Sequence, residues 1–159
     1  MMGWQQIFYY HLCIVDIGLI EIISPPAEFY PDMTSLKQTL GDDMERVTWR
    51  SKQALDFSFL MMYAKSRGQF YVQLEDDVLT KKGFMSIMKH FALGKIAEKK
   101  PWFVIDFCQL GFIGKMFKSV ELPWLVNFFL MFYNDKPGQK ESLNHLAIFF
   151  ILYLFVFPL

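Results

Sequence analysis

This chain has few cysteines and no excess of either charge, and both features limit the functional classes to which it can belong. The 159 residues include two cysteines, Cys13 and Cys108, which are far apart and match neither a CxxC motif nor zinc-ligand spacing. The two thiols can pair or stay free, so they do not indicate a compartment. Sixteen basic residues balance sixteen acidic ones. The charge therefore gives no electrostatic reason to expect a nucleic-acid partner.

Several familiar catalytic patterns are also missing. The three histidines, His11, His90 and His145, are isolated and lack metal-ligand spacing. No serine occupies a nucleophile elbow and no Cys–His arrangement is visible, so a hydrolase is poorly supported. The glycines of Gly111–Lys115 are too closely spaced for a P-loop. This segment predicts either a tight turn or backbone amides that approach a sugar or phosphate.

The end of the sequence lacks charge altogether. After Glu141 there is no Lys, Arg, Asp or Glu, and residues 146–159 are apolar throughout. As a helix this run would be about 21 Å long, whereas a bilayer core is roughly 30 Å thick. It indicates a tail that contacts a membrane, an element of the core, or an abnormal terminus from a truncated or alternatively spliced transcript. Ile7–Val15 is also apolar, but no Lys or Arg precedes it, which makes it a poor secretory signal.

What the chain has in abundance is apolar side chains, which make up 53% of its residues and include 18 phenylalanines. This is enough for one domain with a substantial core. Apolar spacing and turn residues predict strands and helices in alternation. We expect strands at 18–23, 70–74 and 101–107, and helices at 48–68, 81–97 and 122–133. Such alternation implies an α/β fold with a parallel or mixed sheet and helices on its faces.

Three adjacent carboxylates directly follow the strand predicted at 70–74. Glu75, Asp76 and Asp77 come at its carboxyl end, where ligands bind in open α/β sheets. Acidic side chains are rarely buried unless they are paired or bind a metal. Oxygen ligands of this kind suit Mg²⁺ or Mn²⁺, which in turn hold phosphate oxygens. The run predicts a metal–nucleotide site; the alternative is an acidic turn at the start of the following helix.

Three cations near the start of the first predicted helix form a second candidate site. Arg46, Arg50 and Lys52 could contact the phosphates of a nucleotide donor. The alternative is a solvated helix face on which they pair with the nearby acids Asp42, Asp43 and Glu45.

Several segments in order resemble one family, the alpha-1,3-mannosyl-glycoprotein 4-beta-N-acetylglucosaminyltransferases. The resemblance covers Gly18–Tyr133 and includes the acid run. The segments that carry it are residues 18–25, 29–32, 45–53, 60–64, 71–77, 109–117 and 131–133.

This resemblance implies a GT-A type, Rossmann-like glycosyltransferase of the Golgi membrane. Such enzymes transfer N-acetylglucosamine from UDP-GlcNAc to a mannose of an N-glycan, and they use a divalent cation, typically Mn²⁺. By the family's acidic motif, Asp77 would bind the metal, while Glu75 and Asp76 would face the nucleotide. Arg50 is the cation that we assign to the donor. The transfer also needs a carboxylate base, which the sequence does not locate.

The sequence also departs from the family's pattern. We expect a divergent segment at 1–17, a partial glycosyltransferase domain at 18–138 that is incomplete on its carboxyl-terminal side, and an apolar tail at 139–159. The family's membrane anchor and stem are not recognised in it. An alternative is therefore a truncated, non-catalytic relative that binds or regulates other Golgi glycosyltransferases. The apolar helix predicted at 122–133 would supply the interface.

Overall fold

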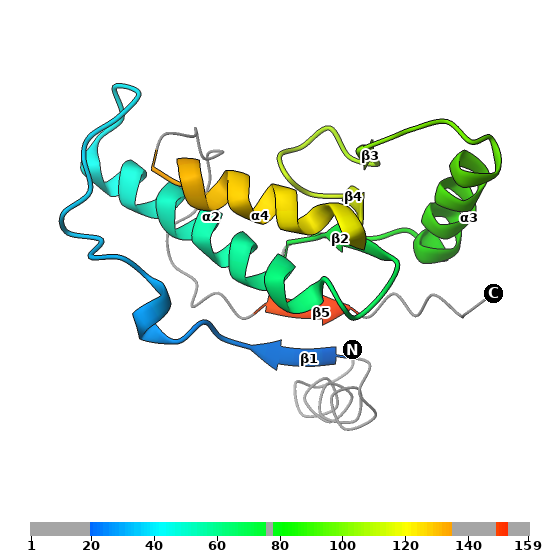
Figure 1. Cartoon of the computed structure of the whole chain (residues 1–159), viewed down its shortest axis with the longest axis horizontal. Helices are drawn as coiled ribbons and strands as arrows, with labels where there is room; N and C mark the ends of the chain where they lie inside the picture. Colours follow the sequence, from blue (N-terminus) through cyan, green and yellow to red (C-terminus); the bar gives the residue numbers. More distant parts are fainter. Residues whose placement is uncertain (1–19, 76–77, 135–148, 153–159) are drawn as a thin grey trace, which may run out of the picture.

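A computed structural model describes residues 20–75, 78–134 and 149–152, the last of these by backbone alone. Two helices, α2 (Met44–Ala64) and α4 (Leu122–Phe132), lie side by side across the molecule (Figure 1). A small sheet borders them, and α3 (Phe84–Ala97) lies beyond the sheet (Figure 1). The remaining elements are β1 (Ile20–Ile23), η1 (Ala27–Phe29), β2 (Phe70–Gln73), β3 (Val104–Asp106), β4 (Lys115–Lys118), η2 (Ser119–Glu121) and β5 (Phe149–Leu152).

The larger sheet has three strands in the order β2-β4-β3. Both pairings are antiparallel: Gln73 lies opposite Lys115, and Lys115 lies opposite Asp106. A second sheet pairs β1 with β5, also antiparallel. The mixed α/β class predicted from the sequence is confirmed. The alternation suggested a parallel or mixed sheet, whereas the pairings among the described strands are antiparallel. The strand β4 was not predicted at all.

Helix α2 begins four residues earlier than its sequence pattern indicated. The side chain of Asp43 accepts a hydrogen bond from the backbone N–H of Arg46 at 2.8 Å, which caps the first turn. The acid at this position satisfies an N–H group that has no partner inside the helix. The predicted start at residue 48 was therefore too late, because Asp43 already caps the helix.

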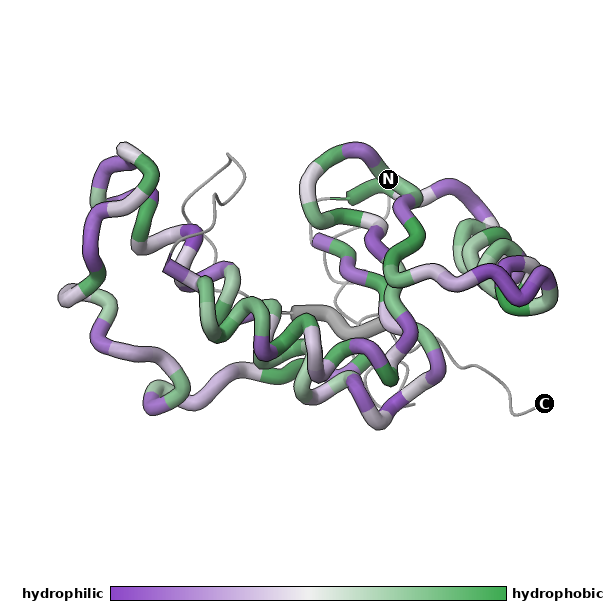
Figure 2. Tube along the Cα trace, turned by 45° about the horizontal axis from the view of Figure 1, so that its top comes forward, coloured by the Kyte–Doolittle hydropathy of each residue, from purple (hydrophilic) through white to green (hydrophobic). Residues whose placement is uncertain are grey.

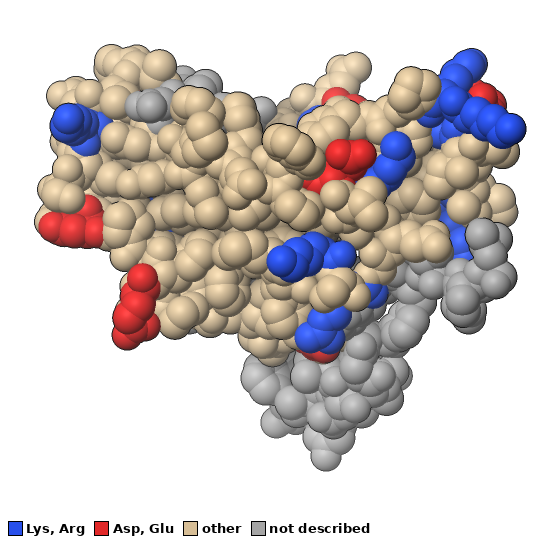
Figure 3. Space-filling model, viewed as in Figure 1, with Lys and Arg blue, Asp and Glu red and all other residues tan. Residues whose placement is uncertain are grey.

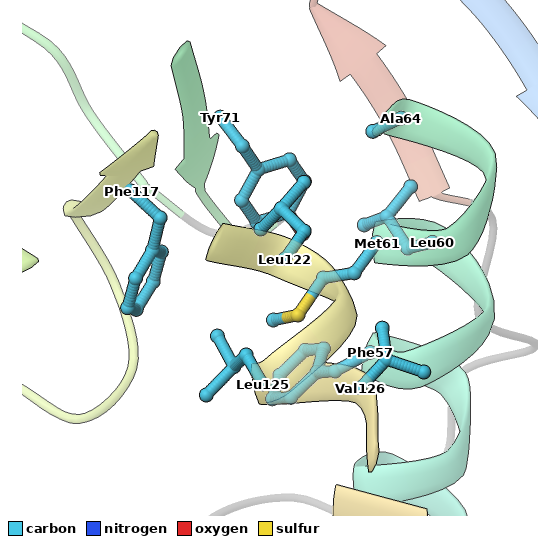
Figure 4. Packing of buried hydrophobic residues seen from close by; sticks show 9 residues of the cluster. All are labelled: Phe57, Leu60, Met61, Ala64, Tyr71, Phe117, Leu122, Leu125 and Val126. Atoms are coloured by element: carbon cyan, nitrogen blue, oxygen red, sulfur yellow. The ribbon is translucent and has the colours of Figure 1, made fainter. Parts of the chain in front are cut away.

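One hydrophobic cluster joins α2 and α4 to one face of the three-stranded sheet. Figure 4 shows Met61 of α2 pointing between Leu122 and Leu125 of α4, with Tyr71 and Phe117 reaching in from β2 and β4. The apolar residues of α2 recur at helical spacing, so they lie on the side of the helix that faces α4. The buried members are Phe57, Leu60, Met61, Ala64, Tyr71, Phe117, Leu122, Leu125 and Val126.

A second cluster fills the other face of the sheet. Phe70 and Met116 point away from the first cluster and pack with Ile105 of β3 and with Met88 and Ala92 of α3. Successive strand residues point to opposite faces, so β2 and β4 contribute one large side chain to each cluster in turn. The sheet is therefore the layer between α3 and the α2–α4 pair.

The connection between β1 and α2 is of another character: hydrophilic residues colour much of it in Figure 2.

Part of the charge-free end is a strand. Ile23 of β1 lies opposite Phe149 of β5, and Ile20 lies opposite Leu152. The rest of residues 146–159 lies outside the described residues. Within the described ranges, no helix is both long and apolar enough to span a bilayer.

Candidate functional site

The acid run begins where β2 ends, as the sequence predicted. Leu74 and Glu75 follow Gln73 directly, and both are half-buried. Asp76 and Asp77, assigned to the nucleotide and the metal, lie outside the described residues. Their roles stay predictions. Among the residues that are described, no group of His, Cys, Asp and Glu side chains is gathered closely enough to hold a metal ion.

Two side chains fix the last residue of β2. The hydroxyl of Tyr71 donates a hydrogen bond to Oε1 of Gln73, and Nε2 of Gln73 donates to the backbone oxygen of Leu74 at 2.8 Å. Gln73 is only 1% exposed. Burial raises the pKa of Tyr71 well above its ordinary value, because the phenolate would lose its hydration. Tyr71 therefore stays a donor, and the strand enters the acid run with a fixed end.

The connection between β3 and β4 also contacts Gln73, the last residue of β2. The N–H of Gly114 donates to the backbone oxygen of Gln73 at 2.7 Å, and the oxygen of Gly114 accepts from the N–H of Phe107 at 3.0 Å. Gly111 and Gly114 both adopt positive φ angles, 52° and 68°. The segment Gly111–Lys115 is therefore a tight turn that leads into β4, which was one of its two predicted forms. The other form, amides that approach a sugar or phosphate, is not tested.

An ion pair closes this turn. Nζ of Lys115 lies 2.5 Å from Oδ1 of Asp106 and 2.5 Å from the backbone oxygen of Cys108. The hydrogen bond from Lys115 lowers the pKa of Asp106, and the N–H of Cys108 at 3.0 Å acts in the same direction. Asp106 is therefore ionised across the neutral pH range. Its negative charge lies at the end of β3, which β4 separates from β2 in the sheet.

Arg50 lies on α2, where its guanidinium is buried. Nη1 contacts Oδ2 of Asp42, and Nη2 donates to the backbone oxygens of Thr39 at 3.2 Å and Asn134 at 3.1 Å. These contacts join the segment before α2 to the end of α4. The alternative considered for Arg50, pairing with Asp42, is thus present, although in the interior and not on a solvated face. Its contact with a donor phosphate stays a prediction.

The other two cations pair with acids four residues away, Arg46 with an acid before α2 and Lys52 with one on the helix. Nε of Arg46 lies 3.2 Å from Asp42, and Nζ of Lys52 lies 2.7 Å from Asp56. Asp56 was not singled out from the sequence, yet it is buried and also accepts a hydrogen bond from the hydroxyl of Tyr30. An acid one turn after a lysine was the signal that could have indicated this pair.

Two of the remaining candidates of the sequence, His90 and Cys108, lie in the described part of the chain. His90 is exposed on α3, where Nδ1 lies 2.7 Å from the backbone oxygen of Ser86. Cys108 is a free, half-buried thiol. The other cysteine and the other two histidines, Cys13, His11 and His145, lie outside the described residues.

Comparison with known proteins decides the family. A family model described as the MGAT4 conserved region matches residues 5–151. The chain belongs to this family. The match extends beyond Gly18 and Tyr133, so it is wider at both ends than the resemblance predicted from the sequence. That predicted resemblance is confirmed.

Curated relatives support the assignment. Over 123 residues, 77% of this chain, it is 57% identical to alpha-1,3-mannosyl-glycoprotein 4-beta-N-acetylglucosaminyltransferase B of Homo sapiens and 55% identical to that of Danio rerio. It is 52% identical to the corresponding transferase A of Gallus gallus over the same length. The aligned part is 22% of the two B proteins and 23% of the A protein, so the chain spans less than a quarter of these relatives. No solved structure matches the chain.

Proposed function

We propose that this chain carries the donor-binding part of an N-acetylglucosaminyltransferase, which transfers N-acetylglucosamine from UDP-GlcNAc to a mannose of an N-glycan in the Golgi membrane. The observation that carries the proposal is the 52–57% identity to proteins named as alpha-1,3-mannosyl-glycoprotein 4-beta-N-acetylglucosaminyltransferases. The acid run at the end of β2 agrees with it.

The residues at the end of β2 suit a divalent cation, Mn²⁺, and the donor's diphosphate. Carboxylate oxygens are the ligands that such cations prefer. We assign Asp77 to the metal, and Glu75 and Asp76 to the nucleotide side. A bound cation would neutralise the charge that builds on the departing diphosphate. The chain's own contribution is a strand end fixed by Tyr71 and Gln73, which holds the first of these acids in a defined place.

Titration calorimetry of the protein with UDP, with and without Mn²⁺, tests this proposal. We expect Mn²⁺-dependent binding that is lost in Asp77→Ala, because one ligand of the cation is removed. Glu28→Ala is the matched control, since Glu28 is an exposed acid on η1, and it should bind as the wild type does. Absence of heat with UDP under both conditions would overturn the proposal.

The surface of α4 favours a second candidate function, binding to another Golgi glycosyltransferase. Trp124 is 75% exposed and Met131 70% exposed, and Phe128 lies between them on the same side of the helix. Figure 3 shows a broad uncharged region in the part of the molecule where α2 and α4 lie. An exposed apolar face of this kind is typical of a protein interface.

Co-purification with Golgi N-acetylglucosaminyltransferases tests the second candidate. The double variant Trp124→Gln with Met131→Gln should lose the partner while keeping the fold, because both side chains are mostly exposed. Ile87→Gln on α3, also exposed, is the control and should retain it. Equal recovery of the partner by both variants would exclude α4 as the interface. Contact of the tail at 139–159 with a membrane also stays a proposal, which vesicle flotation of the full chain would test.

A further inference from the structure

We propose that the turn between β3 and β4 positions Glu75, the first residue of the acid run, for the donor and its cation, with Gly114 as the positioning residue. This inference rests on the proposed function, since it assigns a task to residues around the same site. The turn spans Phe107–Gly114 and meets β2 at the last residue before Leu74 and Glu75.

Gly114 connects two strands through its own backbone. Its N–H donates to Gln73 at 2.7 Å, and its oxygen accepts from Phe107 at 3.0 Å. It thereby fixes the end of β2 relative to the end of β3, immediately before β4 begins. Glu75 lies two residues beyond Gln73. Because only Leu74 separates the two residues, a shift of the peptide at Gln73 is passed on to Glu75.

The conformation of Gly114 excludes a side chain for two reasons. Its φ of +68° is one that residues with a Cβ rarely adopt. An added Cβ would also lie 3.0 Å from Cβ of Cys108 and 3.3 Å from the backbone nitrogen of Cys108. A larger residue at this position would therefore press on Cys108 within the turn, and Cys108 or residue 114 would have to shift.

The ion pair of Lys115 holds the other side of the turn. Its Nζ contacts both Asp106 and the backbone oxygen of Cys108 at 2.5 Å, and its side chain is largely buried. Asp106 in turn accepts from the N–H of Cys108. The turn is therefore fixed at Asp106, Cys108 and Gly114. Metal and donor sites need ligands held to within about 0.5 Å, and a support of this kind supplies that constraint.

The chain contains a matched control for the glycine. Gly41 has a φ of +74°, close to that of Gly114, but an added Cβ there meets nothing within 4 Å. Gly41→Ala and Gly114→Ala thus share the backbone strain, while only Gly114→Ala also presses on Cys108, next to the hydrogen bond of residue 114 to Gln73. We expect Gly114→Ala to weaken Mn²⁺-dependent UDP binding about tenfold, the size of one lost hydrogen bond. Gly41→Ala should change the affinity less than about twofold at a similar loss in Tm.

Hydrogen exchange without ligand gives a readout that does not depend on donor binding. In Gly114→Ala, amides of residues 70–73 should exchange about tenfold faster than in the wild type, because the support of β2 is lost. In Gly41→Ala they should exchange at the wild-type rate. If Gly114→Ala does not fold, Lys115→Met replaces it, with Lys95→Met as control, since Lys95 forms an exposed pair with Glu98 at 3.5 Å.

The outcomes separate the two proposals. If the wild type does not bind UDP, the proposed function is overturned, and exchange at residues 70–73 alone decides the role of the turn. If the wild type binds UDP, affinity decides: equal affinities of Gly114→Ala and Gly41→Ala overturn the role of Gly114 and leave the proposed function standing. A selective loss in Gly114→Ala supports both.

Discussion

Arg50 and Asp42 form an ion pair across the start of α2, with the guanidinium at 1% exposure and the carboxylate partly open to solvent. The same guanidinium reaches the backbone of Asn134 after α4. One buried cation therefore connects three segments: the loop before α2, α2 itself and the end of α4. The α2–α4 pair depends on this contact as well as on its apolar core.

Replacing Arg50 should destabilise the protein strongly. Arg50→Met should lower the free energy of unfolding by about 3 kcal/mol, because removing one member of a buried pair leaves its partners without compensation. Urea denaturation gives the value. Lys95→Met, which removes an exposed pair with Glu98, should change it by less than about 1 kcal/mol. Equal losses in the two variants would show that Arg50 has no special structural role.

The tyrosine hydroxyls predict how stability changes at alkaline pH. Burial, followed by the hydrogen bond to Asp56, raises the pKa of Tyr30 far above its ordinary value of 10.0, and burial alone does so for Tyr71. A raised pKa in the folded state stabilises the fold below the unfolded pKa, and this contribution is lost as the pH rises. Unfolding should therefore become easier above about pH 10.

Phenolate absorbance during a pH titration measures this directly. In the folded protein, Tyr30 and Tyr71 should stay unionised past pH 10 and ionise only as the chain unfolds. Tyr30→Phe should remove one such late-titrating group and cost about 1–2 kcal/mol of stability near neutral pH, because the buried carboxylate of Asp56 loses a donor. Ionisation of every tyrosine near pH 10 without unfolding would contradict the assignment.

The core cluster predicts a large loss for Met61→Ala. Met61 is fully buried between α2 and α4 (Figure 4). Truncation leaves a cavity and should cost about 2–5 kcal/mol by thermal or urea unfolding. Leu79→Ala is the matched surface control, since Leu79 is fully exposed, and its effect should stay within about 0.5 kcal/mol. A small loss for Met61→Ala would mean that the two helices do not pack as described.

Replacing Gly94 by alanine should stabilise the protein. It lies inside α3, and an added Cβ meets nothing within 4 Å. Gly94→Ala should raise the free energy of unfolding by about 0.5–1 kcal/mol, because alanine loses less backbone entropy in a helix. Calorimetric Tm measures it. The opposite sign is expected for Gly83→Ala, since Gly83 has a φ of +79° at the start of the same helix; a gain there would contradict this reasoning.

Much of the secondary structure could be predicted because local patterns specify it. The apolar spacing of α4 predicted residues 122–133, and the helix covers Leu122–Phe132. The strand predicted at 70–74 covers Phe70–Gln73. The start of α2 was harder to predict, because the acids before it are typical of a solvated loop. The structure shows that one of them, Asp43, caps the helix.

The central strand β4 could not be predicted, for a physical reason. Lys115–Lys118 places Met116 and Phe117 side by side, with one in each hydrophobic cluster. This pattern has neither the alternation of a half-buried strand nor the length of a buried one. Its two faces are covered by α3 on one side and by α2 and α4 on the other, and α2 and α3 come from distant parts of the chain. The candidate site was likewise predicted only as far as the acid run, because the turn that contacts Gln73, just before it, lies between β3 and β4.

By itself, the sequence determined the family, the helical and strand periodicities and the carboxylates that follow β2, because each is written in adjacent or regularly spaced residues. Only the tertiary structure decided that Arg50 is interior, that Gly114 contacts Gln73 and that β5 pairs with β1. These contacts join residues far apart in the chain. Their energy depends on packing around both partners, which no local pattern contains.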